Sequence, residues 1–318
     1  MKASVKISIC IPVYNQQQYV LETIQSVINQ RLTCDCEIIV GDDASSDGTP
    51  SILIQLQQKY PKLLVIILRQ RNIGPGLNAA DLYRRARGEY IAHLDGDDLM
   101  LPGKLSRQIE IMDSDERIVI CSHDVVRRTR YGDVYRQAFL SDKFCDLSDL
   151  YRNLPFFANS SKVFRNKGLW GDFSCIHNDM ADFEWHIHQA RMGNIYHCSQ
   201  FLGVYRADIG ITAKDGKLNP ILASSARRVF SEALAEGIPG ILGDELRRLY
   251  AKKILSFALH SLRLNNIEDA KSYASESISI AHCSGLQWLT LMITKSRRIF
   301  YIVSRLLRYV YDVRTNKI

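Results

Sequence analysis

The sequence has little of what marks a membrane-spanning, exported or nucleic-acid-binding chain. No apolar run approaches the roughly 20 residues that a membrane-spanning helix needs. Lys6 interrupts the apolar N-terminal run and no cleavage site follows Pro12, so the N-terminus does not resemble a signal peptide. The net charge is only +7, and seven basic residues against one acidic residue lie between Lys295 and Lys317. The remainder is close to neutral, and we expect no nucleic-acid partner.

Cysteine is present, but not in a pattern that indicates disulfides or a zinc site. The eight cysteines are scattered over 318 residues, and the only close pair, Cys34 and Cys36, lacks the CxxC spacing of a zinc ligand pair. Free thiols are usual in a reducing compartment, so we expect a cytoplasmic protein. A hydrophobic content of 46% and a charged content of 24% are those of an ordinary globular chain.

The first hundred residues alternate between strand-like and helix-like segments. Helices are expected over 17–30, after Thr49 and over 75–87, because apolar residues recur there at helical spacing. Alternation of this kind builds βαβ units, so we predict an α/β fold with a mainly parallel sheet flanked by helices. The expected strands are residues 5–12, 37–40, 63–68 and 89–94.

Polar clusters follow three of these strands. Tyr14–Asn15, Asp42–Asp43 and Asp95–Asp98 each begin where an apolar run ends. In open α/β sheets, ligands bind outside the carboxyl ends of the strands, so we expect the clusters to meet in one site. Carboxylates spaced like Asp95 and Asp97 suit Mg²⁺ or Mn²⁺, which prefer oxygen ligands. The alternative interpretation is a set of Asp-rich turns that cap the following helices.

Taken in this order, the segments resemble the inverting nucleotide-sugar glycosyltransferases of family 2, of the bacterial surface-polysaccharide type, which have the GT-A fold. The resemblance covers about the first two thirds of the chain. It rests on IPVYNQQQYVLETIQSVINQ (11–30), EIIVGDDASSDGT (37–49), RNIGPGLN (71–78) and ARGEYIAHLDGDD (86–98), with a weaker match over 180–206.

The resemblance implies a role for each matching residue. Asp43 would bond the base, commonly uracil, and Asp95 would lie near the ribose and the metal. Asp97 would bind Mn²⁺ or Mg²⁺, and Asp98 would support the rim or approach the acceptor side. Asp208 stands where relatives often have a histidine, and it would either reach a metal or a phosphate or be an exposed loop aspartate. The nucleotide-binding residues implied in this way are Pro12, Tyr14, Asn15, Asp43, Asn72, Asn78 and Asp95, and the metal-binding ones are Asp97, Asp95 and Asp208.

Asp182 matches the family's general base. It lies near the start of an expected helix over 179–191, where the helix dipole favours an ionised carboxylate. Position alone would equally suit a helix-terminal carboxylate without a chemical role, and Asp179 is the second candidate for the base. Ala181 stands where relatives often have glutamate. Phe156–Phe157 and Asn159–Lys162 are expected to shape the sugar and acceptor pocket, whereas His93 is expected to be a core or rim residue.

The sequence of the C-terminal third predicts helices. A helical hairpin is expected over 244–264 and 267–281, followed by one basic amphipathic helix over 287–311. We therefore predict three segments: a GT-A-like domain over 1–215, a helical extension over 216–284 and a membrane-associating tail over 285–318. The tail's arginines lie opposite its apolar face, which suits an anionic membrane surface. That apolar face comprises Trp288, Met292, Ile299, Val303, Leu306 and Val310.

The expected function is that of a metal-dependent inverting glycosyltransferase. It would move a sugar from a nucleotide-sugar, most simply a UDP-sugar, to a saccharide hydroxyl on a polyprenyl-diphosphate-linked acceptor, at the inner face of the cell membrane. One alternative is a non-catalytic nucleotide-sugar-binding scaffold at the membrane. The other is a nucleotidyltransferase, although IPVYNQQQYV (11–20) has neither the glycines nor the basic residue of a phosphate-binding loop.

Overall fold

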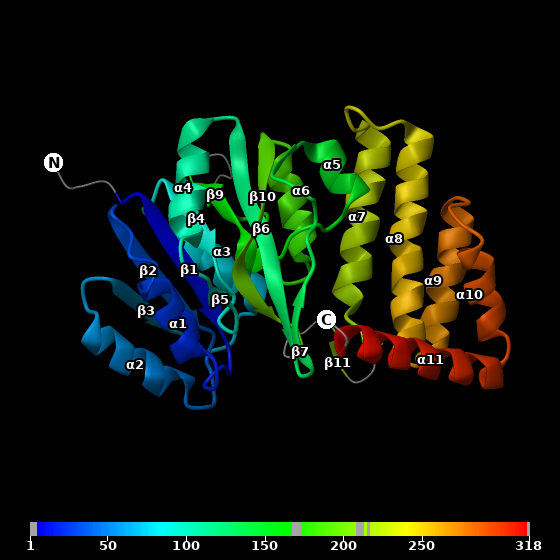
Figure 1. Ribbon diagram of the computed structural model, residues 1–318, viewed down its shortest axis with the longest axis horizontal. Coiled ribbons are helices and arrows are strands. Elements are labelled where there is room, and N and C mark those ends of the chain that lie inside the picture. Colours follow the sequence, from blue (N-terminus) through cyan, green and yellow to red (C-terminus); the bar gives the residue numbers. More distant parts are fainter. Residues whose placement is uncertain (1–4, 167–172, 208–212, 215–216, 317–318) are drawn as a thin grey trace.

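The computed structural model describes residues 5–166, 173–207, 213–214 and 217–316. These residues form a mixed, mainly parallel sheet flanked by helices, with further helices at the C-terminal side, so the predicted fold class is confirmed (Figure 1). The sheet path is β3-β2-β1-β4-β9-β6-β10-β5, with β7 on β6 and β8 on β10. The strands are β1 Ile7–Val13, β2 Cys36–Asp42, β3 Leu64–Leu68, β4 Tyr90–His93, β5 Leu99–Met100, β6 Ile118–Thr129, β7 Gly132–Tyr135, β8 Lys143–Cys145, β9 Val163–Arg165 and β10 Asn194–Arg206, with a separate pair β11 Ala213–Lys214 and β12 Lys217–Leu218.

The strands of the N-terminal half are parallel, and this brings their carboxyl ends to one edge. β1 pairs in parallel with both β2 and β4, and β2 pairs in parallel with β3. The short β9 enters antiparallel between β4 and β6 and joins the two halves of the sheet. The polar clusters after β1, β2 and β4 therefore lie side by side, as the sequence predicted.

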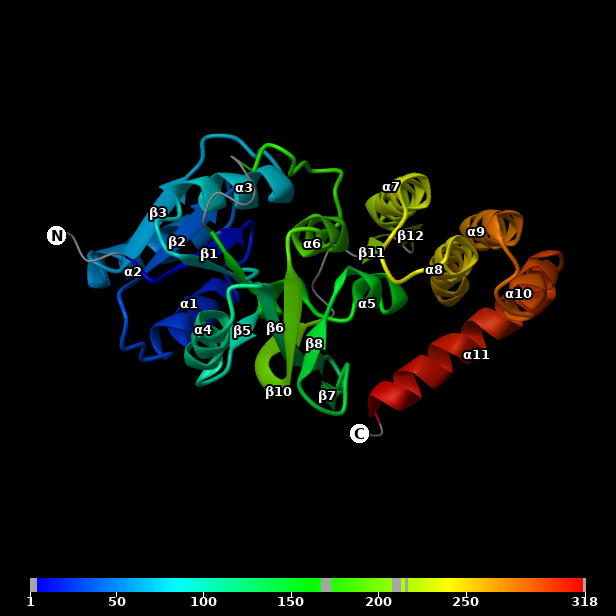
Figure 2. The ribbon, with the colours of Figure 1, turned by 90° about the horizontal axis from the view of Figure 1, so that it is seen from above.

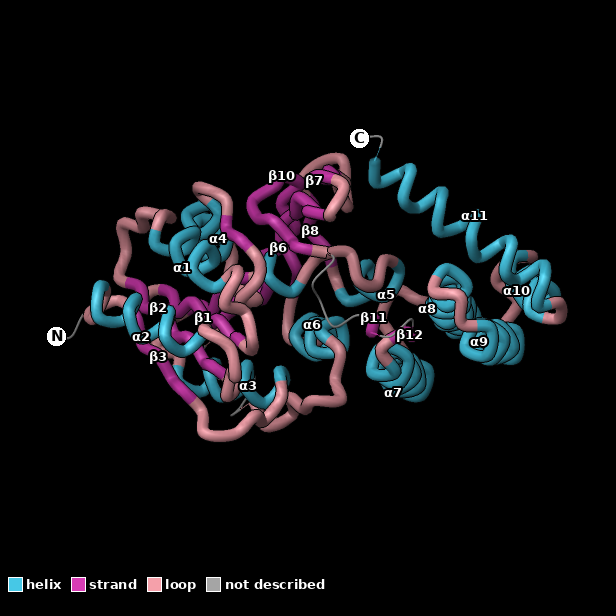
Figure 3. The backbone as a smooth tube through the Cα atoms, turned by 90° about the horizontal axis from the view of Figure 1, so that it is seen from below, coloured by secondary structure: helices cyan, strands magenta, loops and turns pink. Residues whose placement is uncertain are grey.

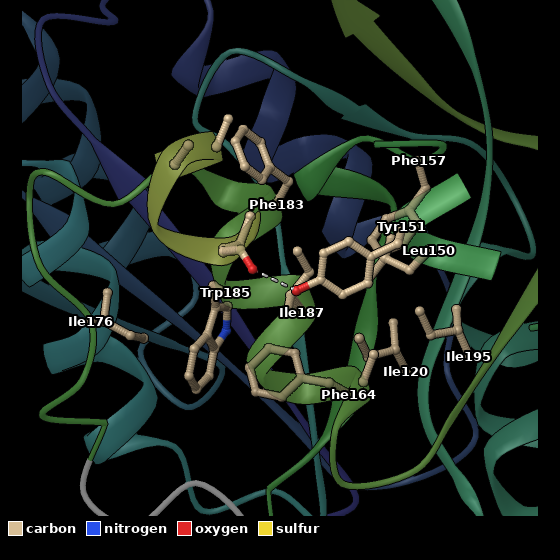
Figure 4. Close-up of a cluster of buried hydrophobic side chains, with 14 of the residues drawn as sticks. Ile120, Leu150, Tyr151, Phe157, Phe164, Ile176, Phe183, Trp185, Ile187 and Ile195 are labelled. Atoms are coloured by element: carbon tan, nitrogen blue, oxygen red, sulfur yellow. Dashed lines mark hydrogen bonds between the residues drawn. The ribbon is translucent and has the colours of Figure 1, made fainter. Parts of the chain in front are cut away.

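Helices cover both faces of the sheet (Figure 2). Apolar residues of α1, α2 and α4 pack against one face, and those of α3, α5 and α6 pack against the other. The aromatic rings of Tyr151, Phe157 and Trp185 lie in one buried cluster with Phe183 and Ile187 of α6 (Figure 4). The helices are α1 Val20–Ile28, α2 Thr49–Lys59, α3 Pro75–Arg85, α4 Lys104–Ser114, α5 Leu147–Arg152, α6 Asp182–Ala190, α7 Pro220–Glu236, α8 Gly243–Arg263, α9 Ile267–Ile280, α10 Leu286–Thr294 and α11 Arg297–Asn316, with a 3₁₀ turn over Asn159–Ser161.

The C-terminal helices share a core with the sheet domain. Phe230 of α7 and Phe257 of α8 belong to the same buried cluster as Tyr151, whose hydroxyl donates a hydrogen bond to the carbonyl of Val229 at 3.0 Å (Figure 4). This continuous core fixes α7 and α8 relative to the sheet. The division of the chain at residues 215 and 284 stays a prediction, and the apolar contacts cross the first of these positions.

The prediction of one continuous helix over 287–311 was wrong. The chain turns between α10 and α11, and Ser296 begins the new helix: its carbonyl accepts from the Phe300 N–H at 2.9 Å and its hydroxyl from the Ile299 N–H at 3.4 Å. Phe300 is buried against Leu262 of α8. Helical periodicity alone does not register a capping serine, because an exposed serine fits within a helix as well.

The turn leads α11 back beneath the other C-terminal helices towards β7 (Figures 1 and 3). Most of the apolar face predicted for the tail is exposed there, including Trp288, Met292, Ile299 and Leu306. The side chain of Val310 lies outside those described. Within the described part of the chain, no helix combines the length and the apolar character needed to cross a bilayer.

Candidate functional site

A cavity of about 590 Å³ opens at the carboxyl ends of β1, β2 and β4. Among the predicted site residues, only Asp208 does not appear in its lining, and Asp208 lies outside the described residues. The structure therefore brings these predicted residues together in one cavity, and their roles stay a prediction. The predicted residues that line it are Pro12, Tyr14, Asn15, Asp43, Asn72, Asn78, Asp95, Asp97 and Asp182.

The loops after β1 and β2 are tied together at one side of this cavity. Asn15 has a φ of 53°, a conformation that asparagine tolerates better than most residues. Its N–H donates to the hydroxyl of Ser45 at 2.8 Å, and its side-chain oxygen accepts from the N–H of Ser46 at 2.8 Å. The neighbouring Tyr14 ring is half exposed and borders the cavity. The ring thus stands on a fixed loop.

Asp43 organises the loop that follows β3. Its two carboxylate oxygens accept the backbone N–H groups of Ile73 and Gly74 at 2.8 and 2.9 Å, and Asn72 also accepts from Gly74 at 3.0 Å. Gly74 has a φ of +90° and a Cβ there would collide with Asn178, so this turn requires glycine. Each oxygen of Asp43 keeps a lone pair for a further donor.

Asn78 is buried in the wall of the cavity. Its oxygen accepts from Nε of Arg69 at 3.0 Å, and its amide nitrogen donates to the carbonyl of Gly41 at 2.8 Å. These bonds fasten α3 to the end of β2. The side chain therefore shapes the wall chiefly by holding the helix in place.

Asp95 is held by two side chains that sequence reasoning did not assign to the site. Its Oδ1 lies 3.1 Å from Nε2 of His93, its Oδ2 accepts from the hydroxyl of Ser160 at 2.7 Å, and Nδ1 of His93 lies 2.7 Å from the Tyr83 hydroxyl. Burial alone would raise the pKa of Asp95, but His93, Ser160 and Lys162 together lower it. Asp95 is thus an oriented, ionised carboxylate. The signal for His93 was its spacing, since residues two apart in an extended segment share a face.

Asp97 and Asp98 are neighbours with different environments. Asp97 faces the cavity, and burial together with the charge of Asp95 raises its pKa to about 6. Asp98 is buried away from the cavity, where its Oδ1 accepts the backbone N–H of Arg206 at 2.9 Å and its Oδ2 has no partner in the described structure. Burial and the two neighbouring carboxylates hold its pKa well above the usual range. Asp98 therefore links this loop to β10 and does not face the cavity.

The Asp95–Asp97 pair fits a divalent cation. Two carboxylates face one cavity, and burial together with the charge of Asp95 raises the pKa of Asp97, so a cation bound between the two carboxylates would offset both charges. In the described part of the chain, no three His, Cys, Asp or Glu side chains group as a complete metal site. Mg²⁺ and similar ions are commonly held by one or two carboxylates, with substrate phosphates and water completing the shell.

Asp182 is the first residue of α6, and its side chain is open to the cavity. The preceding Ala181 is fixed because its N–H donates to the hydroxyl of Ser225 at 2.8 Å. Burial within the site and the charge of Asp95 raise the pKa of Asp182, whereas Lys162 and His93 act against this rise. Asp179, the other candidate base, is exposed outside the cavity lining and lies 3.7 Å from Arg228.

Lys162 brings a positive charge into the same cavity. The side chain is only 1% exposed and borders the cavity beside the two carboxylates that influence it most, Asp182 and Asp95. Burial lowers its pKa to about 7, and these carboxylates oppose the change. Of the segments expected to shape the pocket, Lys162 contributes to this cavity.

A second cavity of about 840 Å³ lies on the other side of Asp182. Phe156 and Phe157, which were expected to shape the sugar and acceptor pocket, line this second cavity and not the first. His186 also lines it, stacked on Phe157 with ring centroids 4.4 Å apart. Four residues line both cavities, so the two cavities adjoin at Asp182. These shared residues are Asn159, Asp182, Tyr205 and Leu222.

A family profile described as glycosyl transferase family 2 matches residues 8–173, just over half of the chain. The uncharacterized protein Rv1520 of Mycobacterium tuberculosis is 32% identical over 203 residues, which cover 61% of this chain and 56% of the relative. A poly(ribitol-phosphate) beta-glucosyltransferase of Bacillus spizizenii is 43% identical over 94 residues, covering 29% of this chain and 15% of the relative. The matches thus span about half, or less, of these relatives' lengths.

Solved structures share the fold over nearly the whole chain. TarS 1–349 of S. aureus, in complex with UDP-GlcNAc, superposes with a TM-score of 0.65 at 18% identity and covers 97% of this chain and 92% of its own. The mannosyltransferase PcManGT of Pyrobaculum calidifontis, in complex with GDP-Man and Mn²⁺, gives a TM-score of 0.57 at 16% identity, covering 95% and 88%. Both likenesses extend through the C-terminal helices.

Proposed function

The chain belongs to glycosyl transferase family 2, and we propose that it is a metal-dependent inverting enzyme that transfers a sugar from a UDP-sugar to a saccharide hydroxyl. One observation carries this proposal. Asp182 stands where two cavities meet, one with the Asp95–Asp97 pair and the other open to a second substrate. A single displacement between two substrates needs this arrangement of one carboxylate beside both.

The first cavity would take the nucleotide-sugar donor. Tyr14 and Asp43 would bind the base, with Asp43 accepting a hydrogen bond through a lone pair that its loop contacts leave over. Asp95 and Asp97 would hold Mn²⁺ or Mg²⁺, which when bound offsets the charge that develops on the departing diphosphate. Lys162 adds a protein cation to the same cavity.

Asp182 would act as the general base. It would accept the proton of the acceptor hydroxyl while the hydroxyl oxygen forms a bond to the anomeric carbon and the bond from that carbon to the diphosphate oxygen breaks. The configuration inverts because attack and departure occur on opposite faces in one step. The raised pKa of Asp182 favours proton acceptance, whereas its position at the start of α6 favours the ionised form that is needed first.

We further propose that the protein binds the membrane surface through α10 and α11, where a polyprenyl-diphosphate-linked acceptor would be found at the inner face of the cell membrane. Large apolar side chains are exposed on both helices, and Arg297, Arg298 and Arg305 are exposed beside them. Anionic lipid would satisfy both features, with about 1 kcal/mol for each basic residue near the surface. The exposed apolar residues are Leu286, Trp288, Leu289, Met292, Ile299, Tyr301, Ile302, Leu306, Leu307 and Tyr309.

A thermal melt with UDP, GDP and CDP, each with Mn²⁺ or with EDTA, tests the donor site. A ligand that binds only the folded chain raises its melting temperature by mass action. The expected result is a shift with UDP that requires Mn²⁺. A shift with GDP or CDP alone would mean that the donor carries that nucleotide and not UDP. If no nucleotide shifts the melting temperature, a scaffold without this activity is favoured.

Sedimentation with anionic vesicles tests the membrane proposal. Ending the chain at Ser284 would uncover the faces of α8 and α9 that Phe300 and Gln287 contact, so substitutions on the exposed face are a cleaner test. Ile302→Ser with Leu306→Ser, and separately Arg298→Glu, should reduce the bound fraction several-fold. Ile54→Ser, at an exposed position of α2 on the opposite side of the molecule from α11 (Figure 1), is the matched control. Equal binding of all variants would refute the proposal.

A further inference from the structure

The second cavity carries an excess of positive charge. Among the described residues its lining contains two acidic ones. One of them, Asp124, is engaged through Oδ1, which lies 3.1 Å from Nε2 of His197 and accepts the N–H of Ala138 at 2.8 Å, whereas its buried Oδ2 has no hydrogen-bond partner in the described structure. The other is Asp182. The cationic residues of the lining are Arg127, Arg136, Arg152, Lys252 and Lys253.

These cationic residues differ in how far an acidic neighbour already offsets their charge. The guanidinium of Arg152 is paired with Glu245 at 2.8 Å, so its charge is largely offset. Arg136 and Lys252 are exposed at the edge of the cavity, and the described structure gives neither of them an ion pair. A ligand that enters the cavity passes these two charges.

Lys253 is the most constrained of the group. Its ammonium donates to the carbonyl of Leu154 at 3.2 Å and lies over the rings of Phe183 and Phe257, 5.0 and 5.2 Å from their centroids. No carboxylate among the described residues pairs with it, and burial alone lowers its pKa to about 8. A partly buried cation without an anionic partner is costly, so the site gains from a ligand that brings negative charge.

We propose that the acceptor is anionic and that the second cavity binds a phosphate or carboxylate of the acceptor through Lys253, with Lys252 and Arg136 at the edge. This inference rests on the proposed function, because it places the reacting hydroxyl of the same acceptor beside Asp182. The aromatic faces of Phe156 and Phe157 in the same cavity would pack on the sugar or polyol units. The oxyanion could belong to a phosphodiester polymer, a lipid diphosphate or a uronic acid.

Calorimetric binding of defined probes distinguishes these sources. The probes are a glycerol-phosphate oligomer, geranyl diphosphate, a chondroitin oligosaccharide and neutral maltohexaose, each titrated into the full chain in the presence of saturating UDP and Mn²⁺. Saturating the first cavity prevents a diphosphate from binding there. We expect at least one anionic probe to bind about tenfold or more tightly than maltohexaose, because hydrogen bonds to charged groups are the stronger ones.

Substitutions assign the binding to the proposed residues. Lys253→Met keeps a long apolar side chain beside the rings of Phe183 and Phe257 and should lower the affinity for the anionic probe about tenfold. Lys252→Glu should also lower this affinity, and because the position is exposed the substitution should leave the fold unchanged. Lys271→Met, at an exposed lysine of α9 outside the cavity, is the matched control and should change nothing.

The outcomes separate this inference from the proposed function. Equal affinity for neutral and anionic probes, or anionic binding that survives both Lys253→Met and Lys252→Glu, would overturn the anionic acceptor, whatever UDP does. Loss of the UDP melting shift alone would instead count against the donor site. In every variant of the second cavity, the UDP shift should remain.

Discussion

The two cavities that meet at Asp182 differ in origin and in charge. The first lies at the ends of parallel strands and presents Asp95 and Asp97, whereas the second is walled largely by β6, α5 and α8 and presents Lys252 and Lys253. The first therefore calls for a cation and the second for an anion. If Asp182 serves both substrates as proposed, each of them would have its own counter-charge beside this one carboxylate.

Each cavity also contains a buried lysine, and the two lysines differ in their surroundings. Lys162 borders the first cavity near Asp95 and Asp182, which stabilise its charged form. Lys253 borders the second cavity with aromatic rings and a carbonyl as its neighbours. The positive charge of Lys162 is thus partly compensated by carboxylates of the protein, whereas that of Lys253 would be compensated by an anionic ligand.

The largest effect should come from the residue that the cavities share. Asp182→Asn keeps the shape of the side chain but removes the base, so transfer should fall about 10³-fold. The UDP melting shift with Mn²⁺ should remain. Asp179→Asn is the matched control, because Asp179 lies outside both linings, and it should leave the rate unchanged. A rate unaffected by Asp182→Asn would remove Asp182 from the mechanism.

The next largest effect should be a difference between substitutions of the neighbouring residues Asp97 and Asp98. Asp97→Asn removes a proposed metal ligand and should weaken Mn²⁺-dependent UDP binding about 100-fold, the upper end of effects at metal sites. Asp98→Asn should leave that binding intact, because Asp98 lies outside the cavity lining and the asparagine oxygen can accept the Arg206 N–H in its place. Titration of UDP at fixed Mn²⁺ measures both. Equal losses in the two variants would contradict the different roles.

The second cavity should respond to pH where the pKa of Lys253 lies. Its pKa of about 8 is below the usual value for lysine, so Lys253 is mostly charged at pH 7 and mostly neutral at pH 9. Binding of the anionic probe should therefore weaken roughly tenfold between these values. Lys253→Arg, which stays charged, should flatten the profile. Calorimetry at both pH values measures this, and an unchanged affinity in the wild type would contradict it.

The smallest effect should come from the support of Asp95. Tyr83→Phe removes the hydrogen bond to Nδ1 of His93, so the orientation of His93 against Asp95 is less well fixed. A hydrogen bond of this kind contributes about 1 kcal/mol, and UDP binding with Mn²⁺ should weaken about fivefold. The anionic probe should bind as before, since Tyr83 lines only the first cavity. A parallel loss at both cavities would mean that Tyr83 acts through overall stability.

The first cavity could be predicted from the sequence because strand ends and motifs fix its residues. Asp43, Asp95 and Asp97 each follow an apolar run within two or three residues, and parallel strands bring such positions together. His93 was assigned to the core or rim and Ser160 lay in a segment expected only to shape the pocket, since their hydrogen bonds to Asp95 depend on side-chain directions. The break at Ser296 was missed because helical periodicity continues across it.

The second cavity could not be predicted from the sequence in the same way. Lys252 and Lys253 lie in the middle of α8, where adjacent lysines are typical of a solvated helix face. Phe257 lies one turn from Lys253 on α8 itself, but only the packing of α8 against α6 and the loop after α5 brings Phe183 and the carbonyl of Leu154 to the same ammonium. That packing depends on long-range contacts, which no local pattern encodes.

The family profile ends at residue 173, whereas Lys252 and Lys253 lie beyond it on a helix of the C-terminal extension. If α8 selects the acceptor, donor and acceptor recognition lie in separable parts of the gene. Divergence of the helical part could then redirect the enzyme to a new polymer while the nucleotide-binding half stays as it is. Relatives grouped by their N-terminal motifs would share donor chemistry, and their glycan products would have to be inferred from the helices.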